Sequence, residues 1–275
     1  MLTVVEIRRL GVDDIPECMK LITDRGWTWT PEQWELMLTL GPGLGAFDGG
    51  QILGTALSTP YPEAQAISGV LVGTWAERRG VGTALMSNIL DISPTPVSVL
   101  YATSMGEPLY ARLGFHPVGA TAEYSGQYTG PAVGVTRPAA ISDISALVAL
   151  DHVVSGYTRP QFWESVLDPA TPYTVRMSDV GVIATRPNPV GFTIGPIIAP
   201  SASVACDMIA DVAACSGQFR AGQVRVDTDN ADVGAFLVER GLEKRTGGCS
   251  LMVRGAAHVP GNRSRYFAPA SHALG

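Results

Sequence analysis

The chain has 275 residues, of which 46% are apolar and 16% are charged. This length and composition fit one large or two ordinary globular domains, and they exclude an intrinsically disordered chain. The net charge of −6, without a broad cluster of basic residues, argues against a nucleic-acid partner and mildly favours a cationic or neutral substrate.

The cysteines and the N-terminus predict a reduced, cytoplasmic protein. Cys18, Cys206, Cys215 and Cys249 form no CxxC pair, and no histidine lies at metal-ligand spacing from them. We therefore expect free thiols and no metal. The first residues, MLTVVEIRRL, lack the pattern of a signal peptide. No apolar stretch approaches the roughly 20 residues that cross a bilayer, so we expect no membrane partner.

The first half of the chain alternates strand-like and helix-like segments. The predicted strands are Thr3–Arg9, Leu44–Phe47, Gln51–Ser58, Ala66–Val72, Pro96–Ala102 and Phe115–Ala122. The predicted helices are Asp13–Arg25, a second helix capped by Thr30 with Pro31 at its first position, Gly82–Leu90 and Pro108–Leu113.

The same order of elements restarts after a Gly-, Ser- and Pro-rich stretch, Ser125–Pro131, which we predict to be a linker. The predicted strands are Val133–Arg137, Tyr173–Met177, Gly181–Thr185, Val190–Ile198, Gln223–Asp227 and Cys249–Val253. The predicted helices are Ile141–Leu150, Pro160–Leu167, Ser203–Ala214 and Ala231–Arg240.

The repeated order predicts two tandem copies of one α/β fold with a mixed sheet, in domains 1–125 and 132–275, the second copy being degenerate. A local echo supports this: Leu109–Phe115 and Phe236–Leu242 align on their shared glycine. The alternative is a single larger α/β domain.

The segment with the clearest chemistry is a basic, Gly-containing turn between a strand and a helix. Glycines let the backbone approach a ligand, and a helix N-terminus offers free N–H groups to a phosphate. The chain has neither a Walker A loop nor a complete dinucleotide fingerprint. The candidate phosphate-binding residues are Arg78, Arg79, Gly80, Val81, Gly82 and Thr83.

This turn resembles the signature of the GNAT superfamily of acyl-CoA N-acyltransferases. That signature has Gln or Arg, two variable residues, Gly, one variable residue, and Gly or Ala; here it reads Glu77-Arg78-Arg79-Gly80-Val81-Gly82. Glu77 departs from the family pattern. A second family segment follows, because Leu109–Phe115 resembles the LYxxLGF segment in which Tyr110 lies near the CoA sulfur.

The resemblance implies an N-acetyltransferase that uses acetyl-CoA, with Val70, Leu71 and Val72 lining the pantetheine arm and Tyr110 protonating the leaving thiolate. The general base stays open. Ala66 stands where many relatives have a glutamate, so the base is Glu63, a water chain or a group of the second domain such as Asp227.

The second half has no phosphate turn, and Leu237 takes the place of the tyrosine, so we expect one active site per chain. It does carry the Asp-x4-Gly-x2-Arg element of a GNAT subgroup, in which we interpret Asp151 and Arg159 as an ion pair or cap. The histidines show no pairing with a nucleophile that would indicate a hydrolase triad; they are His116, His152, His258 and His272.

Three functions stay open at this level. The first is transfer of an acetyl group from acetyl-CoA to a primary amine of an unidentified small-molecule acceptor by direct attack. The second is a pseudoenzyme that binds acyl-CoA without turnover. The third is an interaction protein in which both domains are degenerate; a homodimer is compatible with each.

Overall fold

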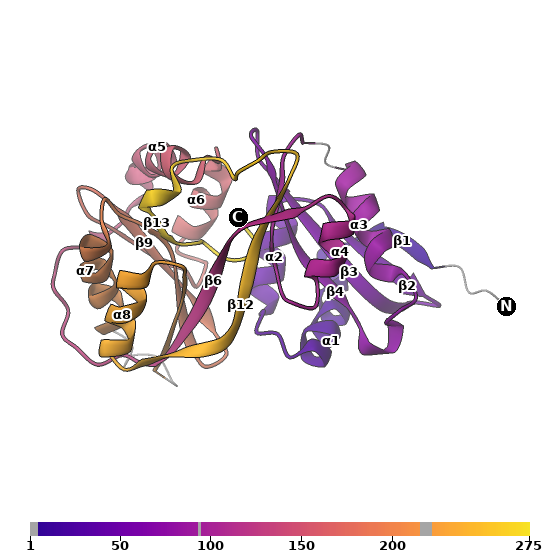
Figure 1. Cartoon of the computed structure of the whole chain (residues 1–275), viewed down its shortest axis with the longest axis horizontal. Coiled ribbons are helices and arrows are strands. Elements are labelled where there is room, and N and C mark those ends of the chain that lie inside the picture. The colour runs from indigo at the N-terminus through magenta and orange to yellow at the C-terminus, as the bar shows by residue number, and fades with distance from the viewer. Residues whose placement is uncertain (1–4, 93–94, 215–221) are drawn as a thin grey trace.

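The computed structural model describes residues 5–92, 95–214 and 222–275, and its two halves repeat one order of elements (Figure 1). The first half contains β1 (Glu6–Arg9), α1 (Ile15–Arg25), α2 (Pro31–Leu40), β2 (Gly43–Asp48), β3 (Gln51–Pro60), β4 (Gln65–Val72), α3 (Val81–Ile92), β5 (Ser98–Ala102), α4 (Glu107–Arg112) and β6 (His116–Gln127). The second contains β7 (Arg137–Pro138), α5 (Ile144–Ser155), α6 (Pro160–Leu167), β8 (Thr174–Met177), β9 (Val182–Asn188), β10 (Gly191–Ile198), α7 (Ala202–Ala213), β11 (Gln223–Thr228), α8 (Ala231–Glu239) and β12 (Leu242–Arg254). A further strand, β13 (Tyr266–Ala268), follows.

Each half begins with the same local feature, a bidentate ion pair between an arginine and an aspartate six residues later. Arg8 donates to both carboxylate oxygens of Asp14 at 2.9 and 2.7 Å, and Arg137 donates to those of Asp143 at 2.8 and 2.9 Å. Both carboxylates also accept a backbone N–H three residues before them. The repeat of this detail supports the predicted duplication.

All strands form one mixed sheet, and the last strand of each half is exchanged with the other half. The strand order is β1-β2-β3-β4-β5-β12-β6-β11-β10-β9-β8-β7, with β13 paired to β10. Strand β12 therefore lies between β5 and β6, and β6 lies between β12 and β11. Each half of the sheet is completed by a strand from the other half of the chain.

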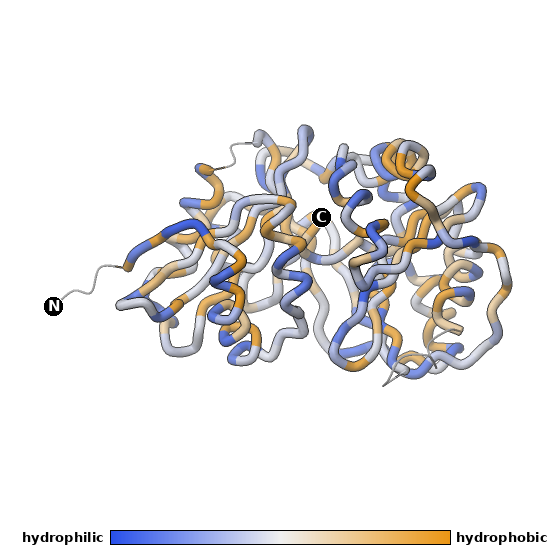
Figure 2. Tube along the Cα trace, turned by 180° about the vertical axis from the view of Figure 1, so that it is seen from behind, coloured by the Kyte–Doolittle hydropathy of each residue, from blue (hydrophilic) through white to orange (hydrophobic). Residues whose placement is uncertain are grey.

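One apolar core joins the two halves on one face of the sheet. It contains residues from α1, α2, α5 and α6, including Trp34 and Trp163, both fully buried. On the opposite face, α3 and α4 cover one core in the first half, and α7 and α8 cover another in the second. The helices alternate hydrophobic and hydrophilic residues along their trace, as amphipathic helices do (Figure 2).

The predicted pairing of Asp151 with Arg159 is confirmed, and it is buried. The Arg159 guanidinium donates to both Asp151 oxygens at 2.6 and 2.9 Å, and Trp163 Nε1 donates to the same carboxylate at 2.8 Å. Arg159 also donates to the carbonyl of Leu274 at 3.0 Å. The C-terminal segment is thereby held between the two halves, where Figure 1 shows the C-terminus.

Most predicted elements are confirmed, and several differ from the prediction in extent, such as α5, which ends at Ser155 and not at Leu150. Val133–Thr136 is not a strand, because backbone N–H groups of this segment donate to the Asp211 carboxylate instead, for example that of Val133 at 2.8 Å. The predicted linker starts later than expected, since β6 continues to Gln127 in pairing with β11. Strand β12 begins at Leu242, well before the predicted Cys249.

The free thiols that we expected are seen at Cys18, Cys206 and Cys249, whereas Cys215 lies outside the described residues. Burial raises the pKa of Cys18 to about 12 and that of Cys249 to about 11, so neither thiol is an activated nucleophile at neutral pH. Within the described ranges, no helix has both the length and the apolar character needed to cross a bilayer.

The strand exchange predicts that neither half folds alone. A fragment of residues 1–130 lacks β12 and leaves the edges of β5 and β6 unpaired. We expect each fragment, 1–130 and 131–275, to show no cooperative urea transition by circular dichroism, and an equimolar mixture to recover one. A folded, monomeric 1–130 fragment would contradict the exchange.

Candidate active site

The site is built where β4 separates from its parallel neighbour β5. Pairing joins only Gln65–Ile67 to Ser98–Leu100, and β12 then pairs with β5 along its other edge. From Ser68 onward, the edge of β4 that faces β5 has no strand partner among the described residues. We call this feature the β4–β5 divergence. The predicted residues Val70, Leu71 and Val72 all lie on this unpaired part of β4.

A bulge in β4 marks the start of the divergence. The register between β3 and β4 shifts between Thr55 and Leu57, and Gly69 has a positive φ of +55°. A Cβ at Gly69 would lie only 2.0 Å from a methyl group of Leu57, so a side chain does not fit there. The hydroxyl of Thr55 donates to the carbonyl of Gly69 at 2.7 Å and holds the bulge in place.

The predicted phosphate-binding turn follows β4 directly and is anchored to α1. Both the backbone N–H and the hydroxyl of Thr74 donate to the Asp24 carboxylate at 2.8 Å. These bonds, the backbone one first, lower the pKa of Asp24. Arg78 and Gly80 then adopt positive φ angles of +59° and +76°, which turn the chain into α3.

The start of α3 presents free donors, as the sequence predicts. The first backbone bond of the helix runs from the N–H of Ala84 to the carbonyl of Gly80 at 3.0 Å. The N–H groups of Val81, Gly82 and Thr83 therefore have no partner within the helix. A Cβ at Gly82 would make ordinary contacts at 3.4 Å, so this position tolerates a small side chain.

Ion pairs distribute the charge around this turn. Arg79 donates to Asp48 of the β2–β3 turn at 2.9 Å, and Glu77 accepts from Arg25 of α1 at 2.6 Å. Arg78 is exposed and has no ion pair in the described part of the chain. The negative charge of Glu77 is thus compensated by Arg25. The guanidinium of Arg78 remains available to bind an anion.

Tyr110 is a residue of α4 and lies on the same face of the sheet as α3. Its side chain belongs to the core that α3 and α4 cover. Its side chain is 7% exposed and contacts Phe115 edge-on at 6.1 Å between ring centroids. A Cβ at Gly106 would lie 2.7 Å from the Tyr110 ring, so the glycine makes room for it. Burial raises the pKa of Tyr110 above its ordinary value, and its hydroxyl has no hydrogen-bond partner among the described residues. The phenol is therefore a protonated donor.

The two carboxylates named as candidate bases are both engaged elsewhere. Glu63 precedes β4 at the end far from the divergence, and it accepts from the backbone N–H and hydroxyl of Thr158 at 3.0 and 2.6 Å. Asp227 is buried on β11 and is bound by Arg225, with a shortest distance of 2.9 Å. Ala66 is buried in β4. The structure brings neither carboxylate to the divergence as a free base.

In the second half, the edge of β10 that corresponds to the unpaired edge of β4 is paired with β13. Strand β10 separates from β11 after Ile194, and there Ile197 and Ile198 pair with β13. A Cβ at Gly195 would lie 2.1 Å from the carbonyl oxygen of Pro269, which shows how closely this segment approaches. Leu237, in the position of the tyrosine, is a buried core residue.

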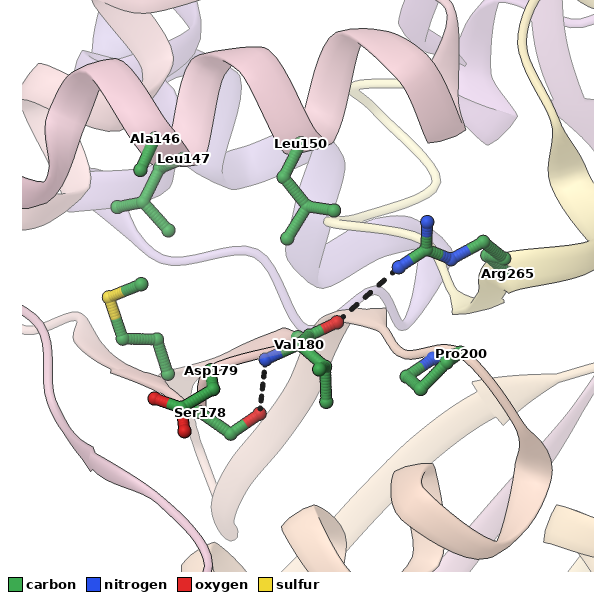
Figure 3. Close-up of a pocket in the computed structure, with 10 residues that line it drawn as sticks. Ala146, Leu147, Leu150, Ser178, Asp179, Val180, Pro200 and Arg265 are labelled. Atoms are coloured by element: carbon green, nitrogen blue, oxygen red, sulfur yellow. Dashed lines mark hydrogen bonds between the residues drawn. The ribbon is translucent and has the colours of Figure 1, made fainter.

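A surface hollow in the second half is chemically unlike the site in the first. It has a volume of about 570 Å³ and lies between α5, the β8–β9 turn and Arg265 (Figure 3). Arg265 donates to the carbonyl of Val180 at 3.4 Å, and Ser178 accepts from the N–H of the same residue at 3.3 Å. Most of its lining is apolar, and its lining includes neither Gly80 nor Tyr110.

Sequence reasoning did not predict the position of His272, which lies against β5 and β6. His272 stacks on Tyr101 of β5 with 4.7 Å between centroids, and its Nε2 lies 2.9 Å from the hydroxyl of Thr121. No local sequence signal places His272 there, because the contact joins the chain's last residues to strands of the first half. Across the described residues, no group of His, Cys, Asp or Glu is arranged to hold a metal ion.

Comparisons with known proteins match both halves of the chain. Two family models, each described as an acetyltransferase (GNAT) domain, match residues 6–118 and residues 147–268. An uncharacterized N-acetyltransferase of Bacillus subtilis, YitH, is 25% identical over 255 residues, which cover 87% of this chain and 88% of that protein.

Two solved structures share the whole fold. One, from Pyrococcus horikoshii and named as a candidate acetyltransferase, has a TM-score of 0.84 and 20% identity, and the match covers 98% of this chain and 96% of that one. The other, a tandem GNAT protein from the clavulanic acid biosynthesis pathway, has a TM-score of 0.67 and 13% identity, with coverage of 93% and 100%. At these identities, the likeness concerns the fold.

The environment of His272 predicts a pH-dependent loss of stability. Burial lowers the pKa of His272 from 6.5 to about 4; Asp227 opposes this shift, and Arg225 and Arg186 reinforce it. Between these two pH values, the unfolded chain binds a proton that the folded chain does not, so stability falls as the pH falls from about 6.5 to about 4.

We expect this contribution to reach roughly 1 kcal/mol per pH unit within that window. The measurement is the urea unfolding free energy at several pH values for the wild type and for His272→Phe, which keeps the ring but cannot be protonated. The wild-type curve should be steeper than the variant curve. Parallel curves would show that His272 titrates normally.

Proposed function

Because the chain belongs to the acetyltransferase (GNAT) family, we propose that its first half transfers an acetyl group from acetyl-CoA to a primary amine. The observation that carries this proposal is the β4–β5 divergence beside the turn of Arg78–Thr83. An unpaired strand edge can bind an amide-containing chain, and the helix start next to it can bind phosphate. The pantetheine arm and the pyrophosphate of CoA have these two chemistries.

The residues present fit the donor. The backbone groups of Val70 and Val72 are available for the pantetheine amides, and the N–H groups of Val81, Gly82 and Thr83 are available for the pyrophosphate. Arg78 adds an unpaired positive charge. When bound, acetyl-CoA supplies the activated acetyl thioester.

Two groups of the chain act on the reacting atoms in this proposal. An N–H of the bulged part of β4 polarises the thioester carbonyl, and the Tyr110 hydroxyl gives its proton to the sulfur. The new C–N bond forms as the C–S bond breaks, and the amine releases one proton to a base. Direct attack is supported by the buried thiols, because neither Cys18 nor Cys249 is an activated nucleophile.

The acceptor is a small molecule in this proposal, although members of the family act on both small-molecule and protein amines. A second function, binding of acyl-CoA without turnover, is favoured by one observation: neither candidate base that the structure describes, Glu63 or Asp227, is a free carboxylate at the divergence. Amine-dependent release of CoA supports the enzyme, whereas tight binding without release supports the second function. The cytoplasmic location and a homodimer stay predictions.

The turn predicts that a carboxylate at position 82 abolishes donor binding. Gly82→Asp introduces a negative charge beside the proposed pyrophosphate site, while an Asp in the first turn of α3 favours the helix itself. We expect acetyl-CoA at about 100 times its Kd to raise the wild-type Tm by roughly 5 °C, and to leave the variant unchanged.

The matched control is Gly82→Ala, whose methyl group fits at ordinary contact distance and should keep the thermal shift. A second control, Ser201→Asp, places the same charge at the N-cap of α7 in the second half and should also keep it. Equal thermal shifts in Gly82→Asp and the wild type would rule out this turn as the donor site.

The proposed role of Tyr110 as proton donor predicts a lower kcat when its hydroxyl is removed. Tyr110→Phe removes the proposed proton donor but keeps the ring in its place against Phe115. We expect kcat to fall by about 10²-fold, with little change in the Kd of acetyl-CoA measured by calorimetry. An unchanged kcat would remove Tyr110 from the mechanism.

A further inference from the structure

Tyr110 and α3, which the proposed donor site uses, lie on one face of the sheet, so we place the acceptor on the opposite face of the divergence. Leu100 and Ala102 pack in the core under α3, so Tyr101 between them points to the other face. Trp29 of the α1–α2 loop approaches the divergence on that face, since a Cβ at Gly69 would lie 3.5 Å from its ring. Tyr101 is the first residue of β5 beyond its pairing with β4.

The segment that covers Tyr101 comes from the second half. After β13, residues 269–275 run between the halves, and the carbonyl of Leu274 accepts from Tyr61 Oη at 3.1 Å and from Arg159 at 3.0 Å. Tyr61 belongs to the first half and Arg159 to the second. The segment is thus fixed to both halves, and it holds His272 against Tyr101.

The imidazole of His272 has one nitrogen engaged and one without a partner. Nε2 lies 2.9 Å from Thr121 Oγ1, whereas Nδ1 has no hydrogen-bond partner among the described residues. The neighbouring carboxylate, Asp227, is already bound by Arg225. A neutral imidazole presents one N–H donor and one lone pair, and the Thr121 hydroxyl can accept or donate; Nδ1 therefore offers a lone pair when Nε2–H donates to Thr121.

We propose that His272 binds the acceptor: its Nε2–H donates to Thr121, and its Nδ1 accepts an N–H of the amine. This inference rests on the proposed acetyl transfer, and it makes the second half a wall of the active site in the first. A primary amine always carries the N–H donors that such a lone pair requires. His272 is a binding residue in this proposal, which does not assign the base that takes the proton.

Three substitutions separate hydrogen bonding from packing. His272→Phe keeps the ring on Tyr101 but removes both nitrogens. His272→Asn keeps a polar group near the position of Nδ1, and His272→Gln keeps one near the position of Nε2. We expect kcat/KM for the amine to fall by about 5- to 10-fold in His272→Phe and His272→Gln, and less than threefold in His272→Asn.

The KM of acetyl-CoA should stay unchanged in all three variants, and His258→Phe, at an exposed histidine, is the matched control. Wild-type kinetics in His272→Phe would overturn the proposal. Equal losses in all three variants, together with a lowered Tm, would also overturn it, because they would show that the histidine only packs.

A second measurement does not depend on turnover, so it stays informative if the acetyl transfer itself fails. In protein labelled with ¹⁵N-histidine, the His272 signals are those missing from His272→Phe. We expect the Nε2 signal of a protonated nitrogen and the Nδ1 signal of an unprotonated one at pH 7. A proton on Nδ1 would overturn the proposal, whatever activity the wild type shows.

Discussion

The exchange of β6 and β12 is the constraint on which the rest of the structure depends. Strand β12 pairs with β5 through Ser98–Ala102 and with β6 along most of its length, and β6 in turn pairs with β11. Neither half of the sheet is complete without the other. Because β12 occupies the far edge of β5, the strand is held in place while β4 turns away from it. The divergence that we propose as the donor site in the first half therefore depends on a strand from the second.

The two halves share one fold but differ at the edge of one corresponding strand, β4 in the first half and β10 in the second. In the first half, the unpaired edge of β4 is next to a turn with free N–H groups and Arg78. In the second, the corresponding edge of β10 is paired with β13, and the next turn leads into α7 with Ser201 as its cap. A strand pairing satisfies the backbone groups that a ligand would otherwise bind. The second half thus contributes structure and, by our proposal, one side chain.

The sequence predicted features that are encoded locally. The order of elements, the Thr30 cap, the turn at Gly80 and the position of Tyr110 each follow from residues close together in the chain. The strand exchange could not be predicted in this way. The first part of β12, before Cys249, is largely exposed and polar, and its pairing with β6 shifts register between Lys244 and Gly248, so its pattern lacks the alternation of a buried strand. The position of His272 depends on contacts across more than a hundred residues.

We propose that this duplicated fold carries one donor site per chain, in the first half. Calorimetric titration of the intact protein with acetyl-CoA tests it most directly, because the stoichiometry counts the sites without reference to the acceptor. We expect one equivalent of acetyl-CoA per chain. Two equivalents would show that β13 does not close the second half, and the absence of binding would show that the turn of Arg78–Thr83 is not a donor site.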